Sequence, residues 1–379
     1  MNKKEPIFKN INLKKDGKPL FDKINYCTRC CIPETMEFQQ FDEFGACNAC
    51  RSSEQKMKID WSVRQKSLEK ILQDAKKKSG NNYDCVVPIS GGKDSAFQLH
   101  ILVKVYKLTP LAVTFSHNWW TETGKYNLEN ILEKLNVDHM MYTPNRGLIN
   151  KLAKKSLKMI GDSCWHCHAG VWSYPFHVAT KFNIPLIIYG ESPADFSGQS
   201  TYANHNIDKK DFAKEGMKYS IKVPPSEMVD EQLSEKDLCL FFPPSEKELL
   251  EKKINGIYLG DYIFWDHERQ TEFLVDEYQW RETKVEGSYK YYKSVECRMS
   301  GVHDYGKFIK RGFGRGTDFV SQDVRAGIMT REEGFDLAKK VDLERPETLD
   351  YYLKITGYSE EEFHKILKTK RNKKFKNKI

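Results

Sequence analysis

The sequence predicts an α/β protein built around a doubly wound parallel sheet. Short β-branched runs alternate with longer segments of helical apolar spacing between residues 85 and 189. A pair of glycines stands at the first junction between such a strand and the helix after it. Alternating elements of these lengths favour a parallel sheet with helices on both faces. Two cysteine pairs precede this region, and a mainly helical C-terminal region is expected after it.

The alternating segments predict four strands and four helices. The strands are expected at 85–89, 110–115, 139–142 and 184–189, and the helices at 96–106, 122–135, 147–159 and 169–182. In a sheet of this class, ligands bind at the carboxyl ends of the strands, near the point where the strand order reverses. The residues that follow each strand are therefore the candidates for binding.

The turn after the first strand has the composition of a phosphate site. It reads Ser90, Gly91, Gly92, Lys93, Asp94 and Ser95. Because the turn precedes a helix, free backbone N–H groups and the helix dipole favour an anion there, and the glycines let the backbone approach it. Lys93 adds a mobile positive charge, and Asp94 could hold a magnesium ion that bridges phosphate oxygens. The spacing differs from the Walker pattern.

Other strand ends supply further candidates. Phe115 ends the second strand and is expected to cover the adenine base, while Gly190 after the fourth strand would let a nucleotide approach. Glu191 could bind ribose, a metal ion or an attacking amine, or it could be a solvent-exposed carboxylate. His117 could act as a base, although a lone loop histidine is more often only a hydrogen-bonding residue.

Four cysteines near the start have the spacing of a zinc site. Cys27 and Cys30 form one C-x-x-C pair, and Cys47 and Cys50 form a second after sixteen intervening residues. This spacing predicts a closed tetrahedral site with a structural role. Cys31 could replace Cys30, but the shift would break the C-x-x-C spacing. Metal binding would stabilise a segment that has little core of its own.

A second cysteine pair, Cys164 and Cys167, has no partner pair at zinc-finger distance. The two thiols could take a direct part in the active site, deliver sulfur, form a redox pair or ligate a metal or cluster. Structural packing under a helix start is the other interpretation. The sequence leaves these alternatives open.

The charge of the chain is unevenly distributed. The net charge is +8, but residues 368–379 hold seven Lys or Arg and no acid, so the rest of the chain carries only +1. A solvated, disordered tail is the expected state of such a run, with an RNA or membrane-surface arm as the alternative. Because the rest of the chain carries almost no basic excess, its charge does not favour a nucleic-acid partner. The polar N-terminus lacks a signal peptide and no run is long enough to span a membrane, so we expect a cytoplasmic protein.

The length of 379 residues allows two or three domains. We expect a zinc-binding module over 1–60, a nucleotide-binding domain over 61–205, a substrate or partner region over 206–367 and the basic tail over 368–379. In the third part, Thr330 and Glu333 form a predicted capping box at a helix start. The glycine-rich run 311–316 is expected either as a structural turn or as a loop that closes over a phosphorylated or nucleotide-linked substrate.

The order Ser-Gly-Gly-x-Asp-Ser at 90–95 resembles the PP-loop of the ATP pyrophosphatase superfamily, whose members bind ATP by its β and γ phosphates and release pyrophosphate. The order of several motifs along the chain adds a resemblance to a narrower family. The four-cysteine start, the loop, and segments 164–167, 184–191 and 312–325 together resemble the N-acetyl sugar amidotransferase family of bacterial O-antigen and pseudaminic or legionaminic acid biosynthesis.

The resemblance implies conversion of a sugar acetamido group into an acetamidino group, with release of AMP and pyrophosphate. It implies ATP, Mg²⁺ and a structural Zn²⁺ as cofactors. Lys93 and Asp94 would act on the phosphates, Glu191 would keep the amine unprotonated, and Cys164 and Cys167 would lie at the active site. Because no glutaminase triad is evident in the sequence, ammonia would come from a partner glutaminase.

Two other readings of the same residues remain. A tRNA thiolase of the same superfamily would use Cys164 and Cys167 to handle sulfur or an iron–sulfur cluster, and its basic tail would bind RNA. A non-catalytic zinc-ribbon binding module is disfavoured by the intact phosphate loop.

Overall fold

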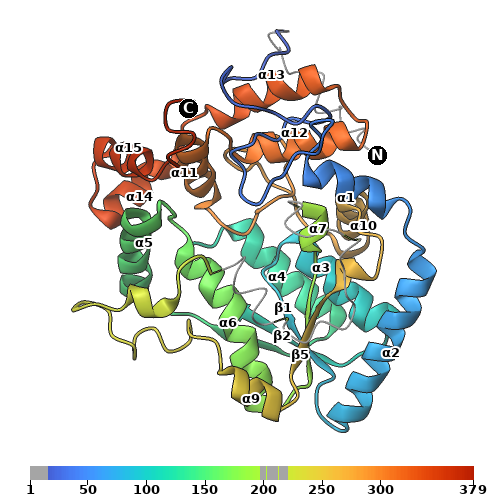
Figure 1. The fold of residues 1–379 in the computed structure, drawn as a ribbon. Helices are drawn as coiled ribbons and strands as arrows, with labels where there is room; N and C mark the ends of the chain where they lie inside the picture. Colours follow the sequence, from blue (N-terminus) through green and yellow to red (C-terminus); the bar gives the residue numbers. More distant parts are fainter. Residues whose placement is uncertain (1–15, 197–201, 203–211, 213–220) are drawn as a thin grey trace.

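The computed structural model of the protein describes residues 16–196, 202, 212 and 221–379 (Figure 1). Its centre is a five-stranded sheet with the order β3-β2-β1-β4-β5, in which every neighbouring pair is parallel. The strands are β1 (Cys85–Pro88), β2 (Pro110–Phe115), β3 (His139–Tyr142), β4 (Leu186–Tyr189) and β5 (Asn255–Tyr258). The predicted fold class, a doubly wound parallel sheet, is confirmed.

The strand order reverses at the centre of the sheet. β1 pairs with β2 on one side, with Cys85 opposite Pro110, and with β4 on the other, where Val86 lies opposite Ile187. The chain moves outward from β1 to β3 and then returns to place β4 on the far side of β1. The carboxyl ends of β1 and β4 therefore flank the crevice in which such sheets bind their ligands.

The fifth strand comes from a segment with no strand signal. β5 pairs with β4 from Leu186↔Asn255 to Tyr189↔Tyr258. Its sequence, Asn-Gly-Ile-Tyr, is short, and Asn and Gly both have a low intrinsic propensity for β-strands. The sheet thus takes a strand from beyond the range 61–205 expected for the nucleotide-binding domain. The expected boundary at 205–206 itself lies outside the described residues.

Helices cover both faces of the sheet. Alternate strand residues point to opposite faces, so Val86 and Ile187 join one core while Val87 and Ile188 join the other. Residues of α5 (Arg146–Ile160) and α6 (Trp165–Phe182) join the first core, as do residues of later segments, among them Phe241, Val302 and Tyr352. The second core is completed by residues of α2 (Trp61–Ser79), α3 (Lys93–His100), α4 (Glu122–Leu135) and α10 (His267–Tyr278). The predicted helix 96–106 is observed as α3 followed by a π-helical turn, Ile101–Val105.

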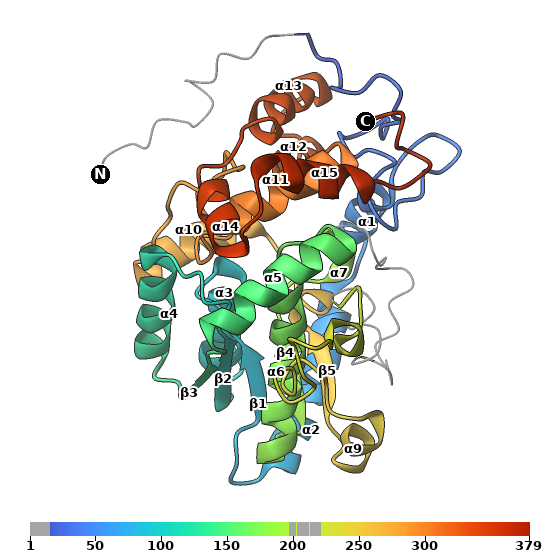
Figure 2. The same cartoon turned by 90° about the vertical axis from the view of Figure 1, so that its left-hand side faces the viewer.

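The C-terminal helices form a cap at one end of the sheet (Figures 1 and 2). They are α11 (Ser300–Arg311), α12 (Arg315–Arg325), α13 (Arg331–Asp342), α14 (Thr348–Thr356) and α15 (Glu360–Thr369). The predicted capping box is present at the start of α13, where Thr330 and Glu333 exchange side-chain and backbone hydrogen bonds. The helical character expected for this region is confirmed. Shorter helices are α7 (Pro193–Phe196) and α9 (Glu246–Glu251).

The N-terminal module packs against the C-terminal cap, although the two are distant in sequence (Figure 1). Arg331 Nε donates to the carbonyl oxygens of Cys27 at 2.9 Å and Cys30 at 3.1 Å. Cys31 packs in one cluster with Phe319 and Phe335 from α12 and α13. The module therefore gains from the cap the core that its own sequence lacks.

The basic tail is folded, which corrects the expectation of a disordered arm. Phe375 is only 7% exposed. Arg371 Nε donates to the carbonyl oxygen of Ile309 in α11 at 3.0 Å, and Lys378 Nζ lies 2.8 Å from a carboxylate oxygen of Glu34. One buried aromatic ring and an acidic partner thus anchor the run, while most of its lysines are exposed to solvent as the composition predicted. Within 16–196 and 221–379, no helix is both long and apolar enough to cross a membrane.

Candidate active site

The turn after β1 is held in place by its own hydroxyl groups. The N–H of Ser90 donates to Ser95 Oγ at 3.2 Å, and the N–H of Gly92 donates to Ser90 Oγ at 3.3 Å. Gly91 has a φ of 77°, and a Cβ at that position would lie 2.5 Å from the carbonyl oxygen of Gly124. Only glycine fits both restrictions. The loop is therefore pre-formed at the N-terminus of α3, as an anion site requires.

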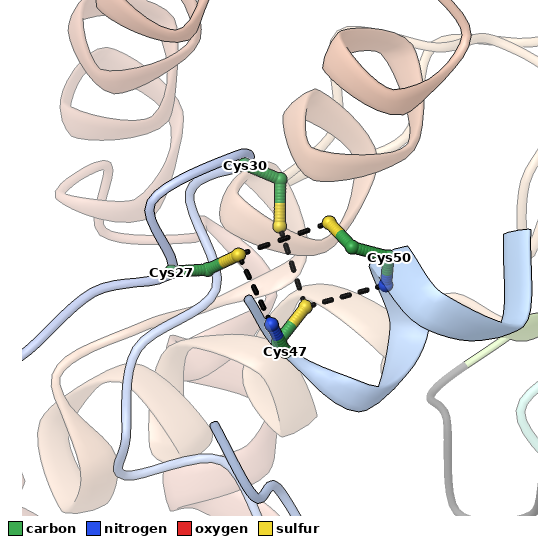
Figure 3. Close-up of side chains that lie close together, drawn as sticks. All are labelled: Cys27, Cys30, Cys47 and Cys50. Carbon is green, nitrogen blue, oxygen red and sulfur yellow. Dashed lines mark hydrogen bonds between the residues drawn. The ribbon is translucent and has the colours of Figure 1, made fainter. Parts of the chain in front are cut away.

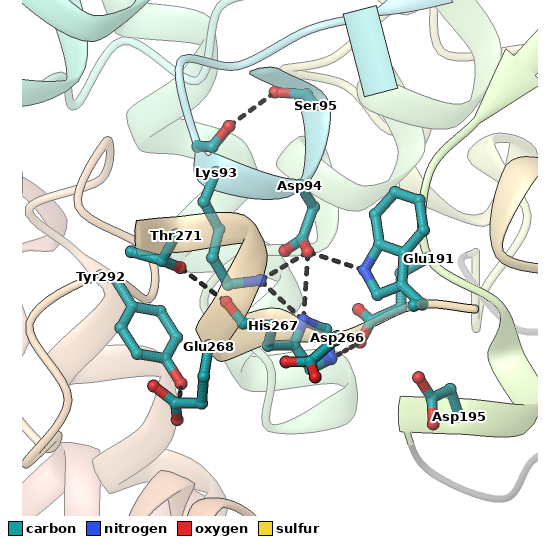
Figure 4. Close-up of polar contacts among 12 residues, drawn as sticks. Lys93, Asp94, Ser95, Glu191, Asp195, Asp266, His267, Glu268, Thr271 and Tyr292 are labelled. Carbon is teal, nitrogen blue, oxygen red and sulfur yellow. Dashed lines mark hydrogen bonds and ion pairs between the residues drawn. The ribbon is translucent and has the colours of Figure 1, made fainter. Parts of the chain in front are cut away.

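Lys93 is buried at the first position of α3, where it is 2% exposed. Its Nζ lies 2.5 Å from Asp94 Oδ1 and 2.7 Å from His267 Nδ1, and Trp265 Nε1 donates to the same Asp94 oxygen at 3.1 Å (Figure 4). Burial lowers the pKa of Lys93 to about 8. Although burial opposes it, the charge of Lys93 holds the pKa of Asp94 well below its usual range. A buried ammonium of this kind suits a polyanionic ligand.

Glu191 joins the same cluster from the end of β4. Its Oε1 lies 2.8 Å from His267 Nε2 (Figure 4). Burial alone would raise the pKa of Glu191, but the neighbouring His267 and Lys293 outweigh it and lower that pKa. His267 thus links the carboxylates of Asp94 and Glu191 through its two ring nitrogens. A carboxylate with a lowered pKa is a weak base, which bears on the role expected for Glu191.

These residues line a cavity of about 640 Å³, which we call the phosphate-loop cavity. The volume lies within the range typical of small-molecule sites. Of the residues expected from the sequence, it contains Ser90, Gly92, Lys93, Asp94, Ser95, Phe115, Cys167, Gly190 and Glu191. Phe115 is packed among Tyr142, Tyr174 and Phe241, so its ring forms part of a fixed aromatic wall. The structure therefore brings the strand-end candidates together.

Glu296 is a residue of this cavity that the sequence did not indicate. It follows Tyr292 and Lys293 in a segment that crosses the phosphate loop, and all three line the cavity. Its Oε2 is buried and accepts no hydrogen bond from the described residues. A Cβ on Gly92 would lie 3.2 Å from that oxygen, which places the carboxylate against the loop. Burial raises the pKa of Glu296.

Cys164 and Cys167 differ in their access to the cavity. Cys167 lines it together with Cys297, whereas Cys164 is not among its lining residues and is buried at the start of α6. Burial raises the pKa of both Cys164 and Cys167. Both side chains are therefore thiols at neutral pH, and a thiol is a poor nucleophile.

His117 also lines the cavity. Its Nδ1 accepts the N–H of Trp119 at 3.0 Å, and burial lowers the pKa of His117 to about 4. The ring is consequently neutral near pH 7. It is a fixed part of the wall, with one nitrogen committed to the backbone.

The two N-terminal cysteine pairs meet at one point (Figure 3). The sulfur atoms of Cys27, Cys30, Cys47 and Cys50 all lie within 4.8 Å of one another, and the four side chains are buried. Arg325 Nη1 lies 3.9 Å from Cys30 Sγ. Cys31 instead points to the carbonyl oxygen of Arg331 at 3.4 Å and takes no part in the cluster. The arrangement fits a four-thiolate metal site, with a positive charge beside it.

Comparisons with known proteins add three likenesses. The chain is 24% identical over 281 residues to "Uncharacterized protein MJ1599" of Methanocaldococcus jannaschii, covering 74% of this chain and 79% of that protein. The NMN synthetase structure from Francisella tularensis aligns with 60% of this chain and 98% of its own, at 16% identity and a TM-score of 0.30. Residues 286–378 match a family model described as "LPS biosynthesis protein WbpG-like, C-terminal domain". The C-terminal region of this chain is thus similar to that of WbpG-like lipopolysaccharide biosynthesis proteins, as the resemblance seen in the motifs implied.

Proposed function

We propose that the protein is an ATP-dependent, AMP-forming amidotransferase that converts the acetamido group of an N-acetyl sugar into an acetamidino group. The observation that carries the proposal is Lys93, buried at a helix N-terminus behind a glycine turn at the sheet's reversal point. The likeness of residues 286–378 to a lipopolysaccharide biosynthesis domain supports a sugar substrate. The type of reaction is inferred from the resemblance of the sequence motifs to the N-acetyl sugar amidotransferase family.

ATP would bind in the phosphate-loop cavity. The loop amides and Lys93 would hold the β and γ phosphates, and Phe115 and Gly190 would border the nucleoside. The site fits this ligand because the left-handed turn at Gly91 leaves no room for a side chain and because Lys93, which is only 2% exposed, is little screened by water from a phosphate in the cavity. Asp94 could hold Mg²⁺, which would neutralise phosphate charge when bound.

The first chemical step would activate the amide. The acetamido oxygen attacks the α phosphorus, an O–P bond forms, and the bond from that phosphorus to the pyrophosphate oxygen breaks. Lys93 and the loop amides stabilise the charge that develops on the leaving pyrophosphate. Without this step the amide oxygen is a very poor leaving group.

In the second step ammonia attacks the activated carbon, and the C–O bond breaks so that AMP departs with the former amide oxygen. Ammonium must first lose a proton to become a nucleophile. Glu296 suits the role of base better than Glu191, because burial raises the pKa of Glu296, whereas the ion pair with His267 helps to lower the pKa of Glu191. We therefore assign the proton transfer to Glu296 and a positioning role to Glu191.

Two further components belong to the proposal. A partner glutaminase would supply ammonia, since no glutaminase triad is evident in the sequence. A structural Zn²⁺ would bind Cys27, Cys30, Cys47 and Cys50, for which buried thiolates at this spacing are the preferred ligands. The family resemblance also points to surface polysaccharide or nonulosonic acid biosynthesis as the setting.

A thiolase is supported less well by the same site. Sulfur transfer needs a reactive thiolate, and burial keeps Cys164 and Cys167 protonated. The basic tail, which would bind RNA in a thiolase, instead packs against Ile309 and Glu34.

The assay is incubation of the purified protein with ATP, Mg²⁺, ammonium and a panel of acetamido sugars. The expected result is sugar-dependent release of AMP and pyrophosphate, with a product in which NH replaces one oxygen by mass. Release of ADP alone, or AMP release that depends on tRNA and a sulfur donor rather than on a sugar, would contradict the proposal.

A further inference from the structure

A second cavity, of about 380 Å³, adjoins the phosphate-loop cavity. The two cavities share His168, Lys293 and Ser294 in their walls. Residues of α11 and α12, together with Lys222, form much of the remaining lining of the second cavity. The two cavities therefore lie next to each other and meet at these three residues.

The second cavity carries an excess of positive charge. Its six cationic side chains are Lys222, Lys293, Lys307, Lys310, Arg311 and Arg315, and only four carboxylates accompany them. Each carboxylate is already paired: Asp162 with Lys222 at 3.0 Å, Asp304 with Arg315, Asp318 with Lys307, and Glu37 with Arg311. Counted over its lysine, arginine and carboxylate side chains alone, the lining has two net positive charges.

The crowding of these cations affects the pKa of Lys310. Burial, together with the neighbouring charges of Arg311 and Lys222, lowers the pKa of Lys310 to about 8. An anion in the cavity would relieve that repulsion. Lys293 acts in both cavities, since its charge also lowers the pKa of Glu191. In addition, Asp318 Oδ1 is buried and accepts no hydrogen bond from the described residues, which leaves an acceptor for a hydroxyl group.

We propose that the second cavity binds an anionic group, a phosphate or a carboxylate, carried by the same acetamido sugar whose amide reacts in the phosphate-loop cavity. The inference rests on the proposed function for the identity of the sugar. The cations then select charged sugars over neutral ones, and Lys293 lies where the anion and the reacting end of the sugar meet. Arg311 and Arg315 provide planar forks suited to either anion.

The experiment measures binding directly. The protein is first saturated with an ATP analogue that has a methylene between its α and β phosphates, so that the phosphate loop is occupied. Four probes are then titrated: N-acetylglucosamine, its 1-phosphate, its UDP conjugate, and N-acetylneuraminate, which carries a carboxylate. Comparison of the phosphate and carboxylate probes distinguishes the two sources of charge. At least one charged probe is expected to bind about tenfold or more tightly than the neutral sugar.

Paired variants at the rim separate charge from folding. Arg311→Gln removes a cation, and Glu37→Gln removes the carboxylate paired with it. The first change is expected to weaken binding of the charged probe about tenfold, and the second to strengthen it. Lys158→Gln is the matched control, because Lys158 lines a separate lysine-rich cavity on α5. Loss of folding cannot produce opposite shifts from two partners of one ion pair.

The outcomes are distinct from those of the proposed function. Equal binding of charged and neutral probes, no binding by any of the four, or equal effects of Arg311→Gln and Lys158→Gln would overturn the second-cavity proposal. AMP formation with neutral acetamido sugars as efficient as with charged ones would overturn it while leaving the proposed function intact. Charge-selective binding without AMP formation would leave the anion site standing and contradict the amidotransferase.

Discussion

Lys93 Nζ lies 2.7 Å from Nδ1 of His267, a residue 174 positions further along the chain. Lys93 begins α3 and His267 begins α10, so the start of one helix meets the start of the other beside the phosphate loop. The second ring nitrogen of His267 contacts Glu191 at the end of β4. Three segments thus hold one buried ammonium in place before any ligand arrives.

Replacement of Lys93 by methionine is the first test of this arrangement. The change keeps the volume of the side chain but removes the charge that would stabilise the leaving pyrophosphate. We expect AMP formation to fall by about 100-fold or more, as for loss of one electrostatic contact to a transition state. AMP release under saturating ATP measures the effect. Lys104→Met, at an exposed position of the π-helical turn, is the control. Retention of activity by Lys93→Met would exclude the assigned role.

Gly91 provides a second test, of the loop rather than of its charge. Gly91→Ala is expected to destabilise the fold by about 1 to 3 kcal/mol from the left-handed backbone alone, and further because its Cβ would lie 2.5 Å from the carbonyl oxygen of Gly124. Gly80 has a φ of 60° with nothing within 4 Å of a built Cβ. Gly80→Ala is therefore expected to lose stability only through its strained positive φ, because its Cβ would contact no other atom. The difference between the two variants in free energy of unfolding, measured by chemical denaturation, isolates the cost of the contact with Gly124. Equal losses of stability in the two variants would show that the loop can move away from α4.

The phosphate loop could be predicted because its signal is local. Six consecutive residues, from Ser90 to Ser95, contain the glycines, the charges and the hydroxyls in one order. The four-cysteine cluster was predictable for the same reason, since two short spacings define it. In both cases the chemistry of a few neighbouring residues decides the local structure, and tertiary packing only has to accommodate it.

His267, Lys293 and Glu296 could not be found in this way. Each stands in a segment without a motif and reaches the site only because α10 packs on α3 and α4 and the chain after it crosses the phosphate loop. β5 was missed because Asn-Gly-Ile-Tyr pairs with β4 by tertiary placement rather than by propensity. For the tail, the composition predicted disorder where the structure has order. Phe375 is buried there, and Lys378 and Arg371 contact the body of the protein.

Removal of the metal proposed at the four cysteines is expected to loosen more than the N-terminal module. Arg331 donates to the carbonyl oxygens of Cys27 and Cys30, so loss of the site also weakens contacts to α13. Cys30→Ser should lower bound zinc, measured by elemental analysis, and the melting temperature together. Cys239→Ser, at an exposed thiol, is the matched control and should change neither. Full zinc content in Cys30→Ser would contradict the assigned ligand set.

Glu296 offers the sharpest test of the second chemical step. A base must be deprotonated, so activity with ammonium is expected to rise with pH through the pKa of Glu296, which burial raises above its usual range. Glu296→Gln should lose that limb of the pH profile and about 100- to 10,000-fold in rate. Glu191→Gln, which changes the other cavity carboxylate, should cost less because Glu191 is already paired with His267.

Hydroxylamine separates the base from a magnesium ligand at the same position. Hydroxylamine is mostly unprotonated at neutral pH and needs no base before it attacks. Glu296→Gln should therefore use hydroxylamine nearly as well as the unmodified protein does, and its sugar-dependent exchange of pyrophosphate into ATP should persist. If Glu296 instead held the metal, exchange and both nucleophiles would fail together, because activation of the amide precedes attack. The ratio of the two nucleophile rates thus distinguishes proton transfer from metal binding at one carboxylate.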